Sequence, residues 1–299
     1  MNRAVFDQLL WRTTKQPPEH AQTVIFETEI TNIRMRDTQS DKPAVVFLCD
    51  PPVTVEAYDE LIRQLDHSYR VVIIELPGFG FSRPQQSGAY QFEEAVVAVE
   101  TALLKLDAGP LIVCGPCICG FVAAELARRK KVPISGLILI QTPDLAGMRQ
   151  WCSRMDPKGM LRRKYIGQLI VRWNARKIVS FWYKYATAKA YDYRPIVTAT
   201  LDALSAGAAY PLASMLQLWT RGLNDDQVDT PTMIVWGKED RSHKHTDPKS
   251  TLTFSPQAEL VEFDGCGHFP ELEMPERFVE AVAGFLKTNA VPLSREQVK

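Results

Sequence analysis

The feature that most constrains this chain is a regular alternation between short apolar runs and longer stretches with helical spacing. The runs are five to seven residues long and mainly apolar, as is typical of strands in a parallel sheet covered by helices on both faces. The sequence therefore predicts an α/β fold with a mostly parallel central sheet. Strands are expected over residues 44–49, 70–76, 111–115, 136–141, 232–237 and 259–263, and helices over 55–65, 91–106, 121–130 and 275–286.

The alternation is interrupted between residues 144 and 229. This segment is rich in helix formers and holds no strand-like run, so it predicts a helical cap inserted between two strands. The expected organisation is a core domain in two parts, residues 1–143 and 230–299, with the cap over 144–229. An antiparallel edge hairpin is expected from segments 24–30 and 33–36, after a short amphipathic N-terminal helix.

Composition argues against several classes of function. The 35 basic and 35 acidic residues cancel, which argues against a chain that binds nucleic acid or a membrane along its whole length. No apolar run could span a membrane, and residues 1–15 lack the apolar stretch of a signal peptide. The six cysteines do not form a spaced disulfide framework. A cytoplasmic protein with reduced thiols is expected, without a nucleic-acid or membrane partner.

The expected cap carries a local charge imbalance. Between residues 145 and 190 there are eleven Lys or Arg residues and one acid, Asp156. Two interpretations are open: an ordinary solvated helix face, or a surface that docks an anionic partner over the active site.

One short motif carries the chemistry. Gly115-Pro-Cys117-Ile-Cys-Gly120 lies where a buried strand meets a helix, which is the context of a nucleophile elbow. Such a turn needs small residues because the strand and the helix pass close together. Cys119 stands where a second glycine is usual. Cys117 occupies the nucleophile position, whereas Cys114 and Cys119 flank it and are expected to pack in the core.

With three further motifs in the expected order, the elbow resembles the α/β-hydrolase superfamily over residues 24–286. The resemblance implies the α/β-hydrolase fold with the cap after the sixth strand, Cys117 as nucleophile and His268 as general base. An imidazole and a helix N-terminus beside the thiol are expected to lower its pKa and favour a thiolate–imidazolium pair. The further motifs are Leu76-Pro-Gly-Phe-Gly-Phe-Ser82, Gly237-Lys-Glu-Asp240 and Gly265-Cys-Gly-His268-Phe-Pro.

The acid that completes the triad has two candidates. Asp240 matches the superfamily's usual position after the seventh strand, and Asp144 follows the sixth strand, where some members place the acid. Either side chain could orient the His268 ring and stabilise its charge.

The oxyanion hole departs from the superfamily pattern. One donor is expected to be the backbone N–H of Ile118, directly after the nucleophile. The aligned position for the second donor is Pro51, which has no N–H, so Asp50 or Val53 is expected to donate instead. This altered hole suggests a specialised reaction.

A cysteine nucleophile implies a thioester intermediate, which favours attack by amines and carbanions over attack by water. Cys117, Asp144 and the loop Cys49-Asp-Pro-Pro resemble Cys-type Dieckmann cyclases, which release polyketide–peptide chains as tetramic acids or pyridones. The resemblance implies acyl transfer with ring closure and no cofactor, on a substrate held by an acidic acyl or peptidyl carrier protein that would dock on the basic cap.

Two other functions stay open. One is a simple hydrolase of esters, lactones, thioesters or C–C bonds, and the other is a non-catalytic binding protein that kept the fold. In the cyclase and in the simple hydrolase alike, aromatic residues of the cap are expected to hold a bulky acyl chain, unless they belong to the core. These residues are Trp151, Trp173 and Trp182.

No metal site is expected. A zinc site from Cys114, Cys117, Cys119 and Cys266 would need a matching distant pair, which this spacing lacks. His243 and His245 are too sparse for a metal site and are expected to be loop residues.

Overall fold

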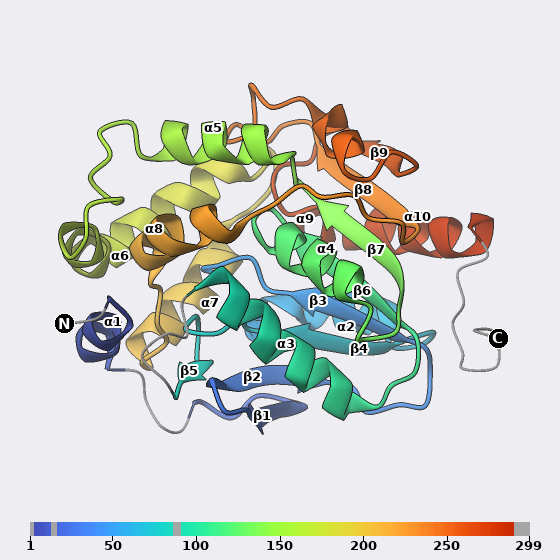
Figure 1. The fold of residues 1–299 in the computed structure, drawn as a ribbon, viewed down its shortest axis with the longest axis horizontal. Helices are drawn as coiled ribbons and strands as arrows, with labels where there is room; N and C mark the ends of the chain where they lie inside the picture. The colour runs from blue at the N-terminus through green and yellow to red at the C-terminus, as the bar shows by residue number, and fades with distance from the viewer. Residues whose placement is uncertain (1–2, 13–16, 86–90, 290–299) are drawn as a thin grey trace.

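A mixed sheet forms the centre of the molecule. The structure is a computed structural model that describes residues 3–12, 17–85 and 91–289. The strand order is β1-β2-β4-β3-β6-β7-β8-β9, parallel from β4 to β9 (Figure 1). This is the α/β-hydrolase architecture that the sequence predicts. The strands are β1 (Thr23–Glu27), β2 (Thr31–Asp37), β3 (Ala44–Leu48), β4 (Arg70–Ile74), β5 (Arg83–Pro84), β6 (Leu111–Pro116), β7 (Ile134–Ile140), β8 (Thr232–Gly237) and β9 (Glu259–Phe263).

The N-terminal strands form the expected antiparallel hairpin, with β1 at the edge of the sheet. β2 lies one position further in, because it also pairs with β4 in antiparallel register and with the short β5. The central strands β3, β6 and β7 are almost wholly buried. Burial on both faces explains why their sequences are continuous apolar runs instead of alternating ones.

Helices cover both faces of this sheet. Helices α2 (Asp59–Leu65) and α10 (Pro275–Thr288) pack together on one face, and α3 (Phe92–Leu106) and α4 (Cys119–Arg129) on the other (Figure 1). The first turn of the helix expected over 55–65 is a 3₁₀ turn, Val55–Tyr58.

The segment between β7 and β8 is helical and lies beside the carboxyl ends of the strands (Figure 1). The helix α6 packs against both α7 and α8, and the N-terminal α1 (Arg3–Trp11) packs against α6 and α8. In the part of the chain that the structure describes, no helix has the length and apolar character needed to cross a membrane. The helices of this segment are α5 (Leu145–Met155), α6 (Ile166–Ala186), α7 (Arg194–Ser205) and α8 (Leu212–Gly222).

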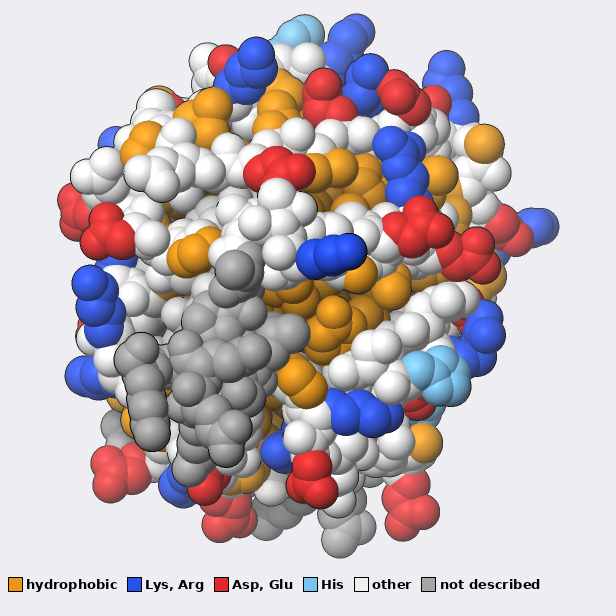
Figure 2. All heavy atoms as spheres, turned by 90° about the vertical axis from the view of Figure 1, so that its right-hand side faces the viewer, with side chains coloured by type: hydrophobic (Ala, Val, Ile, Leu, Met, Phe, Trp, Pro, Cys, Tyr) orange, Lys and Arg blue, Asp and Glu red, His pale blue; other side chains and the backbone are white. Residues whose placement is uncertain are grey.

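The face of the molecule away from these helices carries both acidic and basic side chains. Figure 2 looks at the molecule from the side on which α10 ends, and it shows acidic and basic side chains interspersed around an apolar depression. The excess of Lys and Arg in the sequence of the helical segment is therefore not a general property of the surface.

The turn between β6 and α4 depends on close backbone approach. Cys117 has φ +48, in the left-handed region, and its N–H donates to Ile140 O at 2.7 Å. A β-carbon on Gly115 would lie 2.7 Å from the Gly120 Cα and 2.8 Å from the Cys119 carbonyl oxygen. The small side chains of the motif are thus required by geometry, and Cys119 fits because its own side chain points away from this contact toward Cys49 O, 3.5 Å distant.

We predict that Gly115→Ala destabilises the protein, since the added methyl group meets backbone atoms that cannot move aside. Overpacking of this kind costs about 1–3 kcal/mol. The matched control is Gly284→Ala in α10, where a β-carbon meets nothing within 4 Å, and where alanine should add roughly 0.5–1 kcal/mol. Urea unfolding midpoints measure both changes, and a Gly115→Ala midpoint at or above that of the wild type would contradict the role given to this glycine.

Candidate active site

Cys117 sits at the floor of an apolar cavity. Its side chain is 2% exposed, and it lines a cavity of about 190 Å³ below helices α5, α6 and α8. The elbow places the thiol at the carboxyl edge of the sheet, where the loops after β3, β8 and β9 also converge. Apart from Asp50 and Cys117, the lining side chains are Pro51, Ile118, Trp151, Met155, Leu161, Ile178, Phe181, Trp182, Tyr210, Leu212, Met215 and Leu216.

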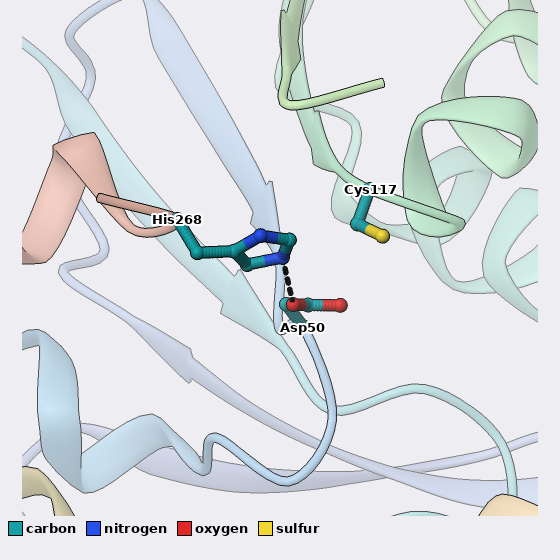
Figure 3. A group of neighbouring side chains, drawn as sticks. All are labelled: Asp50, Cys117 and His268. Atoms are coloured by element: carbon teal, nitrogen blue, oxygen red, sulfur yellow. Dashed lines mark hydrogen bonds and ion pairs between the residues drawn. The ribbon is translucent and has the colours of Figure 1, made fainter. Parts of the chain in front are cut away.

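His268 lies between two carboxylates. Its Nδ1 is 2.5 Å from Asp240 Oδ2, and its Nε2 is 3.1 Å from Asp50 Oδ2. Figure 3 shows the second contact as a dashed line, with the Cys117 sulfur facing the His268 ring and the Asp50 carboxylate. His268 comes from the loop after β9. A carboxylate oxygen at each ring nitrogen favours the doubly protonated imidazolium, in which both nitrogens donate.

The charges of this group stabilise one another. Burial alone would lower the pKa of His268, but Asp240 and Asp50 raise it well above its usual value. Burial alone would raise the pKa of Asp240, but His268 holds it well below its usual value. Asp240 also accepts hydrogen bonds from Gln141 Nε2 at 2.7 Å and Ser242 N at 2.8 Å, so this carboxylate is fixed in place.

Asp144 lies elsewhere. Its side chain accepts a hydrogen bond from Gly147 N at 2.7 Å and caps the N-terminus of α5. Of the two acids proposed from the sequence, the structure brings Asp240 to the His268 ring and uses Asp144 as a helix cap.

The side chain of Asp50 lies near the Cys117 thiol, a position that the sequence does not reveal. The donor atoms of Asp50, Cys117 and His268 all lie within 4.8 Å of one another. Burial raises the pKa of Asp50, with His268 opposing the shift and Asp240 adding to it. Among the expected oxyanion donors, Val53 N–H donates to Asp50 O at 2.9 Å within its own turn, whereas Ile118 lines the cavity beside Cys117.

The thiol is neutral in this environment, contrary to the expected thiolate. Burial raises the pKa of Cys117 to about 11; Asp50 and Asp240 add to the shift, and His268 opposes it. The expectation left out the burial of the sulfur, which is the largest cause of the raised pKa, and the two carboxylates that add to it.

His243 is a site residue that the sequence analysis assigned only to a loop. It does lie in the loop after β8, but its side chain is 2% exposed, and its Nε2 is 3.9 Å from Cys117 Sγ. Burial lowers its pKa to about 3, with His268 and Arg154 acting in the same direction against Asp240. The available signal was its position three residues after Asp240, in a loop that the resemblance already placed at the site.

The aromatic residues expected to bind substrate separate into two groups. Trp151 and Trp182 line the cavity, and the Trp182 ring lies edge-on to His268 with ring centroids 5.1 Å apart. Trp173 is 77% exposed on the outer face of α6, so its predicted place in the pocket is wrong. Helical spacing alone could not show which face of α6 meets the core.

Among the residues that the structure describes, two groups of side chains have the donor atoms to hold a metal ion: Asp50, Cys117 and His268, and Asp240, His243 and His268. Both groups use His268, whose nitrogens already face carboxylates. Two of the other thiols considered for zinc contact backbone carbonyls instead, Cys119 that of Cys49 and Cys266 that of Gly267.

Comparison with known proteins supports this geometry at the level of a family. Residues 45–281 match the model of the alpha/beta hydrolase family. The chain is 25% identical over 260 residues to a pimeloyl-acyl-carrier-protein methyl ester esterase of Nitrosomonas europaea, covering 81% of this chain and 95% of the relative. It is also 25% identical over 239 residues to a 2-hydroxy-6-oxononadienedioate/2-hydroxy-6-oxononatrienedioate hydrolase of a Pseudomonas species, covering 74% and 78%.

Solved structures show the same fold. An epoxide hydrolase of Vigna radiata superimposes with a TM-score of 0.72 at 15% identity, covering 89% of this chain and 98% of that one. An esterase of Exiguobacterium antarcticum gives a TM-score of 0.69 at 16% identity, covering 90% of this chain and all of that one.

We predict that Asp240→Asn lowers turnover of an acyl thioester by about 10²–10⁴-fold, because the neutral amide neither orients nor stabilises the His268 imidazolium. Asp144→Ala should leave turnover close to that of the wild type but reduce stability by about 1 kcal/mol through loss of the α5 cap. Steady-state kinetics and urea unfolding on both variants test this, and a larger kinetic loss in Asp144→Ala would reverse the assignment.

Proposed function

Because the chain belongs to the alpha/beta hydrolase family, we propose that it is an acyl-transfer enzyme that hydrolyses an ester or thioester through Cys117. The observation that carries the proposal is the place of this thiol, which lies at a left-handed turn between strand and helix, on the floor of an apolar cavity. The acyl chain would occupy the cavity between Trp151 and Trp182. The family resemblance and the esterase among the relatives support hydrolysis as the main reaction.

Acylation uses the three groups that surround the thiol. The Cys117 S–H bond breaks as sulfur attacks the substrate carbonyl, and the proton passes to the Asp50 carboxylate. The His268 imidazolium then donates its Nε2 proton to the departing alcohol or thiol, and a thioester on Cys117 results. Water attacks this thioester, its proton returns to His268, and the sulfur recovers the proton held by Asp50.

The negative charge on the substrate oxygen also needs a donor. The N–H of Ile118 is one, as in other nucleophile elbows. Once Asp50 carries the thiol proton, its O–H becomes a second donor inside the cavity. A side-chain acid would thus replace the backbone amide that Pro51 cannot provide.

Ring-forming release of the Dieckmann type is a second candidate. A specific observation favours it: twelve of the fourteen residues that line the cavity are apolar, aromatic or proline residues, so water has few polar groups to bind beside the thioester. In such a site a carbanion of the bound chain can compete with water for the acyl group. His268 or Asp50 would remove the proton from the carbon between two carbonyl groups.

One experiment separates these functions. The protein is incubated with an acyl thioester that carries a β-ketoamide, and the products are identified by mass spectrometry. Free acid is expected as the main product, whereas a ring product would make cyclisation the main reaction. Cys117→Ala should abolish either product, while Cys152→Ser, which removes another buried thiol, should not. If the wild type forms neither product and iodoacetamide does not alkylate Cys117 selectively, the result favours a non-catalytic binding protein.

We also propose that the outer face of α6 docks an acidic carrier protein. Of the eleven cations between residues 145 and 190, all within the described chain, only Arg162 lies within 4.0 Å of a carboxylate, that of Asp156. Phe181 is 61% exposed on α6 and also lines the cavity, so the cavity opens beside this unpaired positive charge. A carrier-bound chain could enter there, guided by electrostatic attraction.

If the carrier protein docks on α6, charge reversal there should weaken binding of the carrier-bound substrate alone. Lys177→Glu combined with Lys184→Glu should raise KM for a carrier-bound thioester several-fold, and the wild-type KM should rise with salt. The same pair should leave KM for a small soluble thioester unchanged, and Lys287→Glu on α10 should change neither. Equal effects on the carrier-bound and the small substrate would contradict docking at this face.

A further inference from the structure

The thiol of Cys117 has a second imidazole neighbour that the acylation steps above do not use. His243 Nε2 lies 3.9 Å from Cys117 Sγ, within hydrogen-bonding range for sulfur, and both side chains are 2% exposed. His268, by contrast, directs its Nε2 at Asp50, 3.1 Å away. Whether His243 donates a hydrogen bond to the sulfur or accepts one from it depends on whether its Nε2 carries a hydrogen.

Aromatic rings fix the orientation of His243. Its ring stacks on Trp151, with centroids 5.7 Å apart and planes at 17°, and on His268, with centroids 5.5 Å apart and planes at 23°. Trp236 meets it edge-on at 5.4 Å. A ring enclosed in this way keeps Nε2 toward the sulfur and Nδ1 toward the opposite side.

A chain of two hydrogen bonds on that opposite side favours one tautomer. His243 Nδ1 lies 3.2 Å from Thr246 Oγ1, and this hydroxyl lies 2.9 Å from Arg154 Nη2. A guanidinium only donates, so Thr246 accepts from Arg154 with its oxygen. The Thr246 proton can then be donated to His243 Nδ1, and in that arrangement the ring hydrogen is on Nε2, facing Cys117.

We propose that His243 is a catalytic residue that donates a hydrogen bond from Nε2 to the Cys117 thiolate, with Thr246 and Arg154 as its positioning residues. This inference rests on the proposed function in one respect, namely that Cys117 is the nucleophile. When the S–H proton moves to the Asp50 carboxylate, sulfur becomes negative, and the His243 N–H contacts that charge without giving up its proton.

The need for such a donor follows from the charges around the sulfur. The titratable groups facing Cys117 are Asp50 after β3, Asp240 and His243 after β8, and His268 after β9, together with the thiols of Cys119 and Cys152. Two carboxylates oppose a thiolate there, and a single imidazolium, already paired with both, favours it. Around His243 itself, Asp240, His268 and Arg154 are the charged groups, and the ring remains neutral among them.

The test is the rate of Cys117 alkylation by iodoacetamide as a function of pH, followed by intact mass and peptide mapping. His243→Phe keeps a flat ring but removes the donor, so the rate at neutral pH should fall about tenfold and the midpoint of the pH profile should rise by about one unit. Thr246→Val removes the proton that favours this tautomer and should shift the profile in the same direction, whereas Thr246→Ser should keep the wild-type profile.

The controls separate this inference from the proposed function. His245→Phe makes the same change two residues away on an exposed side chain and should leave the profile unchanged. His243→Gln, which restores an N–H donor, should recover most of the rate, and urea midpoints verify that each variant is folded. Selective alkylation that His243→Phe or Thr246→Val leaves unchanged overturns the role of His243 alone. If Cys117 in the wild type reacts no faster than the other buried thiols, both the inference and the proposed nucleophile fall.

Discussion

The capture of one imidazole between two buried carboxylates determines the chemistry of this site. Asp240 and Asp50 approach opposite nitrogens of His268, at 2.5 and 3.1 Å. Buried charges persist only when they are paired and hydrogen-bonded. Here each carboxylate is paired with the His268 ring, and the ring is paired with both carboxylates. The consequence is a site whose charges favour a protonated histidine and a protonated thiol.

This arrangement changes the usual division of roles in a nucleophile–histidine–acid site. In the proposed mechanism, the histidine nitrogen that would ordinarily accept the proton of the nucleophile faces Asp50 instead, and that carboxylate accepts the proton. The same loop lacks an N–H at Pro51, and the side chain of its neighbour takes a position inside the cavity. Loss of one backbone donor and gain of one acid are therefore linked features of a single loop.

The predictable part of the structure followed from local chemistry. Apolar runs identified the buried strands because a sheet covered on both faces admits few polar residues. The motif around Cys117 indicated a tight turn because small residues are needed where backbones meet within van der Waals distance. By contrast, Trp173 and Trp182 lie on the same helix and look alike in sequence, yet one is exposed and the other lines the cavity. Which face of a helix is buried depends on neighbours that are distant in the chain.

By itself, the sequence determined the α/β architecture and the elbow at Cys117, since these depend on periodicity and on motifs of adjacent residues. The resemblance to the α/β-hydrolase superfamily implied that His268 lies beside that thiol. Only the tertiary structure decided that Asp240 and not Asp144 reaches the ring, that the Asp50 side chain faces the thiol, and that His243 is buried against sulfur. Contacts in this site join residues far apart in the chain, 126 positions for Cys117 with His243 and 218 for His268 with Asp50. The protonation of these groups depends on burial and on the sum of neighbouring charges, which no local pattern encodes.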